Sequence, residues 1–212
     1  MWKQITEYFA MSSDRYFMML SAHVCISLGS LMIAIIIGIP AGVFCVRHNR
    51  VQKIVTAIFG TLRIIPSLAI LLLILPVLGT GAVPAAIALV LLAVPPILMN
   101  TISGLESVSE IVLENAEGLG MDQSQIWIKV RFPLALPLIL TGMKTAAVEI
   151  ISSATLASKI GAGGLGDIIF TGIGLFRTDL LLIGGISVAV LSVLTGVLFE
   201  LLGRMLLKYK YT

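Results

Sequence analysis

The residues of this chain that could bind a partner are concentrated in one polar interval, residues 114–137 (ENAEGLGMDQSQIWIKVRFPLALP), within an otherwise apolar sequence. Glu106, Glu110, Glu114 and Glu117 fall within about 80° of one another if this region is helical. Anionic lipid headgroups repel such an acidic stripe, so a helix resting on the membrane surface is disfavoured. Two interpretations of the acidic stripe remain: an ordinary solvated face, or a docking surface for another protein. We favour the docking surface.

Capping signals predict two short helices in this interval. Residues 107–110 (SVSE) have the S-x-x-E form of a capping box, so a helix is expected to begin near residue 108. Gly118 and Gly120 can end it, because glycine adopts the left-handed conformation that follows a helix C-terminus. Residues 122–125 (DQSQ) form a second capping pair, and Pro133 is expected at the entry to the next membrane span.

Few charged or hydroxyl groups lie inside the apolar segments, and these could line a polar path through a membrane. Lys144 and Glu149 would point about 140° away from each other on one helix, so each needs a partner elsewhere. Snorkelling of Arg63 and hydrogen bonds between helices are the alternatives. The candidates for such a path are Arg63, Pro66, Ser67, Glu149, Ser152, Ser153 and Thr155.

A glycine-rich segment follows residue 160, and three of its glycines match the pattern G-x-G-x-x-G. That pattern indicates a dinucleotide site only within a strand–helix–strand unit, whereas here it lies between apolar segments. Tight turns and close approach of backbones are the simpler interpretation. The residues singled out in this segment are Gly161, Gly163, Gly164, Gly166 and Asp167.

Several classes of chemistry lack support in the sequence. It contains no G-x-x-x-x-G-K-[ST] motif, so the chain is not expected to hydrolyse ATP. It has no His, Cys and carboxylate cluster with metal-ligand spacing and no convincing nucleophile–base pair, so we expect no metal, no cofactor and no enzymatic activity. The net charge of +3 fits basic residues at the ends of membrane spans better than binding of nucleic acid.

The elements that must position these residues are membrane helices. The chain is 58% hydrophobic and 12% charged, whereas soluble domains have about 25% charged residues. Residues 16–46 and 64–105 contain no charged side chain. We predict an all-α polytopic protein with five spans, at residues 18–46, 57–78, 82–104, 132–158 and 180–203. A sixth span over residues 160–176 is possible, but its glycines and Asp167 favour a re-entrant or surface element.

The distribution of basic residues predicts the orientation. With the N-terminus outside, the cytoplasmic segments hold eight basic residues, Arg47, Arg50, Lys53, Lys129, Arg131, Arg204, Lys208 and Lys210. The outside segments then hold four, Lys3, Arg15, Lys159 and Arg177. This favours N-out and C-in, with a cytoplasmic tail at residues 206–212. Residues 1–17 are expected to form an amphipathic interfacial helix, with a frayed terminus as the alternative.

The polar interval resembles the coupling motif of permease subunits in binding-protein-dependent ABC importers. That motif reads Glu-Ala-Ala, three residues, Gly, nine residues, Ile, one residue, Leu-Pro. Every spacing is kept by Glu114, Asn115, Ala116, Gly120, Val130, Phe132 and Pro133. The chain departs from the motif at Asn115, where the family has alanine, and at Val130 and Phe132, where the apolar character is kept.

Two further segments resemble permeases for glycine betaine, carnitine and choline. They are residues 63–70 (RIIPSLAI) and residues 154–167 (ATLASKIGAGGLGD). Methionine-importer permeases share diluted versions of both. The likeness covers roughly residues 18–205, which would form one type I ABC importer transmembrane domain with its coupling helices at about residues 107–131.

The resemblance implies a role and a set of partners. The chain would form the membrane pathway of an osmoprotectant importer in a bacterial cell membrane. It would pair with a second permease subunit, dock cytoplasmic ABC ATPase subunits on the coupling motif, and receive an extracytoplasmic binding protein near the glycine segment. A methionine or amino-acid importer is the alternative within this class, and a secondary transporter driven by an ion gradient is the alternative outside it.

Overall fold

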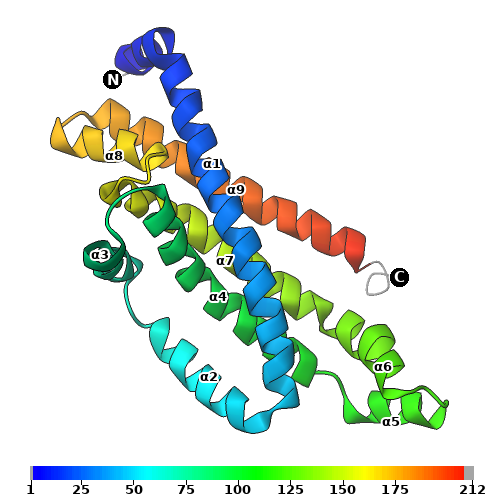
Figure 1. Ribbon diagram of the computed structural model, residues 1–212. Coiled ribbons are helices and arrows are strands. Elements are labelled where there is room, and N and C mark those ends of the chain that lie inside the picture. The colour runs from blue at the N-terminus through cyan, green and yellow to red at the C-terminus, as the bar shows by residue number, and fades with distance from the viewer. Residues whose placement is uncertain (1, 208–212) are drawn as a thin grey trace.

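The computed structural model describes residues 2–207, and within that range the chain is helical and contains no strand (Figure 1). The long helices are α1 (Trp2–Arg47), α4 (Ala82–Glu106), α7 (Phe132–Ala157) and α9 (Thr178–Leu206). The shorter ones are α2 (Asn49–Leu62), α3 (Ser67–Leu78), α5 (Glu110–Gly118), α6 (Gln123–Gln125), the π-helix η1 (Ile126–Arg131), the 3₁₀-helix η2 (Ser158–Ile160) and α8 (Leu165–Gly174).

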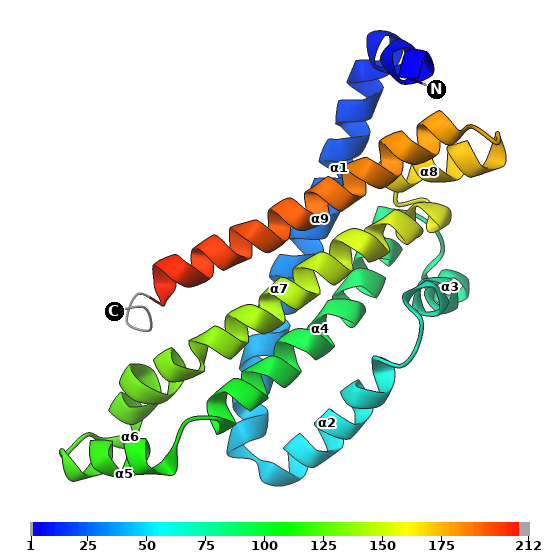
Figure 2. The ribbon, with the colours of Figure 1, turned by 180° about the vertical axis from the view of Figure 1, so that it is seen from behind.

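Helices α1, α4 and α7 pack side by side and enclose a core of small and aliphatic side chains (Figures 1 and 2). This core comprises Leu31, Ala34, Leu89, Ala93, Val94, Ile97, Ala146, Ala147, Ile150 and Ala154. Glycine is required where the helices come closest. A Cβ at Gly42 would lie 2.7 Å from Thr101 Cβ, and one at Gly142 would lie 2.7 Å from Asn100 Cβ. Small residues allow this approach, which gives membrane helices their packing energy.

The prediction of an all-α polytopic fold is confirmed. Within the described residues, four continuous helices are long and apolar enough to cross a membrane: α1, α4, the helix Gln123–Ile160 and α9. The bent pair α2 and α3 gives a fifth crossing if it forms one span. The glycine-rich region predicted as re-entrant or superficial forms η2 and the ten-residue α8. At about 1.5 Å per residue, α8 is too short to span the bilayer.

The second predicted span, residues 57–78, is wrong as a continuous helix. Helices α2 and α3 are bent by 98° relative to each other at the break between Leu62 and Ser67. Pro66 has no N–H and disfavours helical backbone at Ile65, so the helix stops and restarts at this point. The preceding loop is also shorter than the predicted break at residues 47–53, because α2 begins at Asn49.

Other boundaries also differ from the prediction. The fourth span was expected to begin at residue 132, but helical structure is continuous from Gln123 to Ile160. The N-terminal region was expected to be a separate helix up to residue 17; the structure has such a helix, but the kink that separates it from the rest of α1 lies at the non-helical Ser12 (φ −137°, ψ 23°). This kink turns the first residues away from the axis of α1 (Figures 1 and 2). Most of the predicted tail, residues 208–212, lies outside the described residues.

The segment that matches the coupling motif and the glycine segment lie at opposite ends of the bundle (Figures 1 and 2). The α5 end consists of α5, α6 and η1, and it projects beyond the helices that carry it. The α8 end consists of η2, the glycine segment and α8, and it lies close to the N-terminal turn of α1. Helix α7 connects the two ends, so a displacement at one of them can be transmitted through a single helix.

Candidate functional site

The turn between α5 and α6 is fixed by backbone hydrogen bonds around Gly120. The N–H of Gly120 donates to Glu117 O (2.8 Å), and the N–H of Met121 donates to Ala116 O (3.2 Å). These two bonds make a Schellman motif, in which the residue after the C-cap adopts a left-handed conformation. Gly120 has that conformation, with φ +82°. The predicted helix-ending role of this glycine is therefore confirmed.

The second predicted capping pair is also present. Asp122 Oδ1 accepts a hydrogen bond from the N–H of Gln125 (2.9 Å), and Gln125 Oε1 accepts one from the N–H of Asp122 (3.2 Å). Gln123 Nε2 donates to Glu117 Oε1 (2.6 Å), which links the two sides of the turn. The segment is therefore an ordered helix–turn–helix, in which the second helix continues into α7.

The side chain of Trp127 holds this segment against the bundle. The guanidinium of Arg47 lies 4.6 Å from the centre of the Trp127 ring, and that of Arg131 lies 4.8 Å from it. Arg131 Nε also donates to Leu105 O at the end of α4 (3.1 Å). Trp127 packs on the buried cluster that includes Leu105 and Ile139. The α5 end is thus connected by side chains to α1, α4 and α7.

The outer surface of the α5 end is unusually apolar for a charged segment. Ile111, Leu119 and Ile128 are 68%, 84% and 71% exposed. Glu110 and Glu114 are exposed on the same short element. Exposed aliphatic groups rimmed by charge are typical of protein-interaction surfaces. This arrangement can dock a partner that offers an apolar groove with basic neighbours.

The predicted capping box at residues 107–110 is wrong, and with it the continuous acidic stripe. Helix α4 runs to Glu106, and the hydroxyl of Ser107 donates back to Gly104 O (2.8 Å), so it does not cap α5. Helix α5 begins at Glu110, two residues later than expected. Glu106 therefore belongs to α4, where Gln52 Nε2 of α2 donates to its Oε1 (2.6 Å).

The seven residues that match the coupling motif occupy different environments. Glu114 and Asn115 are exposed, and Ala116 is buried against the turn, with 5% of its surface exposed. Val130 is half-buried in η1, and Phe132 is 39% exposed at the start of α7, where Pro133 follows as a helix-compatible first-turn residue. Because Asn115 points to the surface, its departure from alanine leaves the packing of α5 intact.

The candidate path residues of the second span lie at its bend. Arg63, Pro66 and Ser67 occupy the break between α2 and the start of α3, and Arg63 is exposed. Arg63 is the basic group whose charge acts on Glu149 of α7. The bend therefore brings a basic side chain within electrostatic range of a carboxyl group on α7.

The candidates on α7 do not all share one face. Glu149 and Ser152 are three positions apart, and Ser152 is exposed, with its hydroxyl donating to Val148 O (3.1 Å). Ser153, in contrast, is only 3% exposed and lies in the packed interior. Thr155 is half-buried and donates to its own helix. The structure thus groups Glu149 with Ser152 and separates Ser153 from them.

The glycine segment forms a tight series of turns at the α8 end. Gly161, Gly163 and Gly164 have φ values of +86°, +71° and +88°, which non-glycine residues rarely adopt. A Cβ at Gly164 would lie 3.1 Å from His23 Nδ1 of α1. His23 is fully buried, and its Nε2 lies 3.1 Å from Ile151 O of α7. A Cβ at Gly166 would overlap Thr155 O of α7, so the segment packs by backbone contact against both α1 and α7.

Asp167 lies in the first turn of α8, beside a polar cleft of about 260 Å³ that Arg15, Thr171 and Arg177 also line. Burial raises the pKa of the Asp167 carboxyl, and the positive charge of Arg15 opposes that change. Arg177 pairs with Asp179 at 2.5 Å. The α8 end therefore presents a mixed-charge surface next to the glycine turns.

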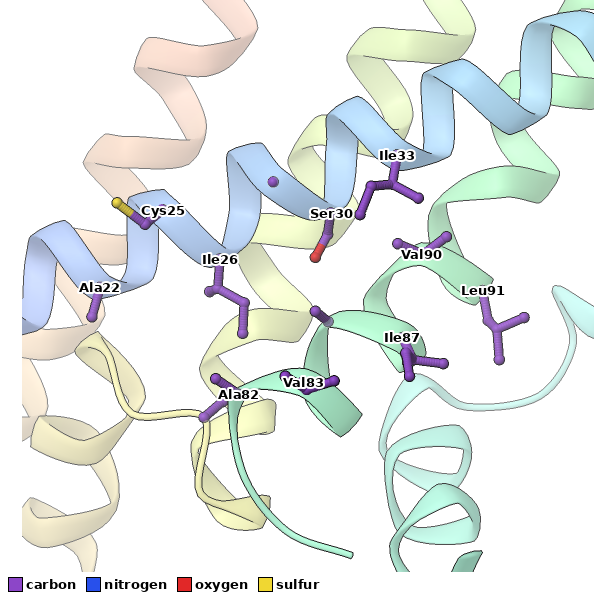
Figure 3. Close-up of a pocket in the computed structure, with 13 residues that line it drawn as sticks. Ala22, Cys25, Ile26, Ser30, Ile33, Ala82, Val83, Ile87, Val90 and Leu91 are labelled. Atoms are coloured by element: carbon purple, nitrogen blue, oxygen red, sulfur yellow. The ribbon is translucent and has the colours of Figure 1, made fainter. Parts of the chain in front are cut away.

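A second hollow of about 650 Å³ lies between α1 and α4 (Figure 3). Among the described residues, no charged side chain lines it, and Ser30 supplies its hydroxyl group. Ile26, Ile33 and Val90 project into it from the two helices (Figure 3). This lining suits an apolar occupant within the membrane and offers nothing that would hold a charged solute.

Two contacts of this site could not be found from the sequence. Trp127 and Arg47 are 80 positions apart, and no local pattern links them. The contact of His23 with Gly164 depends on how the glycine turns fold back on α1. Two signals were available in the sequence: a histidine within the apolar residues 16–46 and a run of glycines after residue 160, each without an evident local reason.

The chain matches the family described as the binding-protein-dependent transport system inner membrane component over residues 31–208. It belongs to this family. The chain is therefore a multi-pass permease subunit of the inner membrane, in an ABC importer whose ATPase is a separate subunit. Such a system works with an ATPase, a paired permease and a binding protein. Membership removes the alternative of a secondary transporter driven by an ion gradient.

Individual relatives agree with this membership. The chain is 42% identical over 170 residues to the carnitine transport permease protein OpuCB of Listeria monocytogenes, covering 80% of this chain and 78% of the relative. It is 32% identical over 205 residues to the glycine betaine/carnitine/choline transport system permease protein OpuCD of Bacillus subtilis. This match covers 96% of this chain and 90% of the relative.

The fold is likewise that of a known importer subunit. A chain from inward-facing structures of the MetNI methionine ABC transporter matches with a TM-score of 0.77 at 21% identity. The match covers 90% of this chain and 95% of the other. It confirms the type I importer architecture predicted from the sequence.

Proposed function

We propose that the chain, paired with a second permease subunit, forms the translocation pathway of an importer for glycine betaine, carnitine or choline, and that the ATPase docks on α5 and η1. One observation carries the docking assignment. The α5 end is ordered by the Gly120 turn and the Asp122 cap, is connected to three long helices through Trp127, and exposes Leu119 and Ile128.

Such a unit works as a lever. If closure of the ATPases moves α5, the stack of Arg47 on Trp127 passes the force to α1, and η1 passes it directly to α7. A floppy loop would absorb the same displacement, because flexible segments cost little energy to deform. The excess of basic residues on this side of the spans supports a cytoplasmic position for the α5 end, with the N-terminus outside.

A substitution at Gly120 tests the docking assignment. Gly120→Asp forces a side chain onto a residue with φ +82° and adds a charge to the docking surface, so co-purification of the cognate ATPase should be lost while membrane insertion survives. Normal docking of this variant would refute the lever.

A matched pair of alanine substitutions, at Gly120 and Gly118, tests the backbone conformation of the turn without adding a charge. A Cβ at Gly118 or at Gly120 would meet no atom within 4 Å, and only Gly120 has a positive φ. Gly120→Ala should therefore weaken ATPase docking, and Gly118→Ala should not. Equal losses would mean that the turn conformation is irrelevant.

The substrate class rests on the names of the relatives. Reconstituted vesicles containing the chain, its cognate ATPase and its binding protein should take up labelled glycine betaine, carnitine or choline when ATP is present. ATP-dependent uptake of methionine, with none of these three compounds transported, would reassign the system to the methionine type. Uptake that is independent of ATP would contradict the role itself.

We also assign Glu149 and Arg63 to the pathway. Their opposite charges lie on the same side of the bundle, where a passing solute with a positive ammonium group would be favoured by a carboxylate. Glu149→Gln should slow uptake several-fold without reducing assembly with the ATPase. Unchanged uptake would exclude this position from the pathway, whereas Ser153→Ala, at a buried site, serves as the comparison within α7.

A further inference from the structure

A cleft between α7 and α9 is not explained by the transport role. It has a volume of about 240 Å³, and the residues that give it polar character are Thr141, Lys144, Glu200 and Arg204. On each helix the lining residues recur at three- and four-residue spacing, so the cleft follows the contact face of both helices. The two helices diverge towards the C-terminal end of α9 (Figures 1 and 2).

Lys144 brings a positive charge into this cleft. In the part of the chain that the structure describes, it makes no hydrogen bond and no ion pair. Its stem lies against Gly196 of α9, where a Cβ would be 3.8 Å from Lys144 Cε. A charged group at this depth is costly unless it is paired or reaches water. Since Glu149 lies about 140° away around α7, it does not share this face.

Arg204 lines the same cleft as Lys144. Its guanidinium bonds to Glu200 Oε1 at 2.8 Å, which directs it back by one helical turn. Glu200 is one further turn from Gly196, and both basic side chains line the same cleft. A single phosphate can accept hydrogen bonds from two such donors. With one carboxylate and two cations, the cleft carries a net positive charge.

The surroundings of the cleft are those of a lipid site. Helix α9 is a membrane span, and its side away from the cleft carries the aliphatic side chains of Val197, Leu201 and Met205, which are 48%, 52% and 69% exposed. Acyl chains can cover these aliphatic side chains while a headgroup enters between the helices. The cleft opens at the C-terminal end of α9, which the positive-inside count assigns to the leaflet that is rich in anionic lipid.

We propose that the cleft between α7 and α9 binds the headgroup of an anionic phospholipid, with its phosphate held by Lys144 and Arg204. The bound lipid neutralises the charge of Lys144 and fills the space where the two helices diverge. This role is independent of which solute the importer carries and of where the ATPase docks.

Direct lipid binding to the purified full-length chain tests this site. Native mass spectrometry of the delipidated protein, titrated with dioctanoyl phosphatidylglycerol and separately with dioctanoyl phosphatidylcholine, gives the two affinities. We expect tighter binding of phosphatidylglycerol, and an approximately tenfold loss in Lys144→Gln, since that variant removes a charge-assisted hydrogen bond. Lys144→Arg should keep most of the affinity, which controls for misfolding.

Two further variants test whether phosphatidylglycerol binding depends on the charges within this cleft. Glu200→Gln removes the negative charge beside Arg204 and should strengthen binding of phosphatidylglycerol. Arg50→Gln removes an exposed basic residue of α2 that is outside the cleft, and it should leave binding unchanged. Equal losses in Arg50→Gln and Lys144→Gln, or equal affinities for the two lipids, would overturn the assignment.

Discussion

At the α5 end of the bundle, side chains make the structure-determining contacts, whereas at the α8 end the backbone makes them. The α5 end is held by the stack of Arg47 on Trp127 and by the Asp122 cap. Its outer aliphatic side chains, Leu119 and Ile128, stay exposed. At the α8 end, Gly164 places its backbone directly against His23. An element that must bind a partner keeps its side chains available, and an element packed by backbone contact cannot tolerate an added side chain.

The largest effect expected from this difference is at Gly164. Gly164→Val should destabilise the protein by about 3 kcal/mol, because it combines a strained positive φ with overlap on the buried His23. The thermal midpoint of the purified variant measures this loss. Gly174→Val is the control, since no atom lies within 4 Å of a Cβ at Gly174. Equal midpoints would contradict the tight backbone packing of the α8 end.

An intermediate effect is expected at Trp127. Trp127→Ala removes a ring that stacks with Arg47 and Arg131 and packs on Leu105, and it should cost about 2 kcal/mol. Uptake per ATP hydrolysed should also fall, because the α5 end loses its connection to α1. Trp127→Phe keeps an aromatic face and should retain most of both properties. If the alanine and phenylalanine variants behave alike, the ring is not the connecting element.

The smallest effect is expected at the cap of α6. Asp122→Ala removes the acceptor of the Gln125 N–H and should lower the free energy of unfolding by about 1 kcal/mol. Ser124→Ala, on the same exposed turn and without a capping role, should have no measurable effect. Chemical denaturation of both variants in one detergent compares them. A larger cost at Asp122 than at Gly164 would reverse the proposed difference between the ends.

Local signals were reliable where a few neighbouring residues decide the outcome. The Asp122 cap and the left-handed Gly120 each follow from backbone chemistry within about six residues, and both were predictable. The capping box at Ser107 has the same sequence form but fails, because α4 extends to Glu106 and the hydroxyl bonds to Gly104. The two motifs have different outcomes because α4 packs in the core and extends past the expected helix start. A four-residue motif cannot predict that packing.

The candidate path residues show the same limit. Ser152 and Ser153 are adjacent and chemically identical, yet Ser152 is exposed and Ser153 is buried. Periodicity separates them by about 100° around α7, but it does not say which direction faces the core. The interaction of the opposite charges of Arg63 and Glu149 depends on the bend of 98° between α2 and α3. The presence of Pro66 in the sequence predicts a break in the helix but not the angle of the bend.

The sequence by itself determined that this chain is a helical membrane protein, where most of its spans lie, and which segment carries the coupling motif. These properties depend on the transfer of apolar side chains into lipid and on backbone bonding between near neighbours, both of which a linear pattern records. Only the tertiary structure decided that Trp127 lies between two arginines, that Gly164 faces His23, and that Lys144 faces α9. Those contacts join distant positions through close packing, whose geometry depends on all the helices at once.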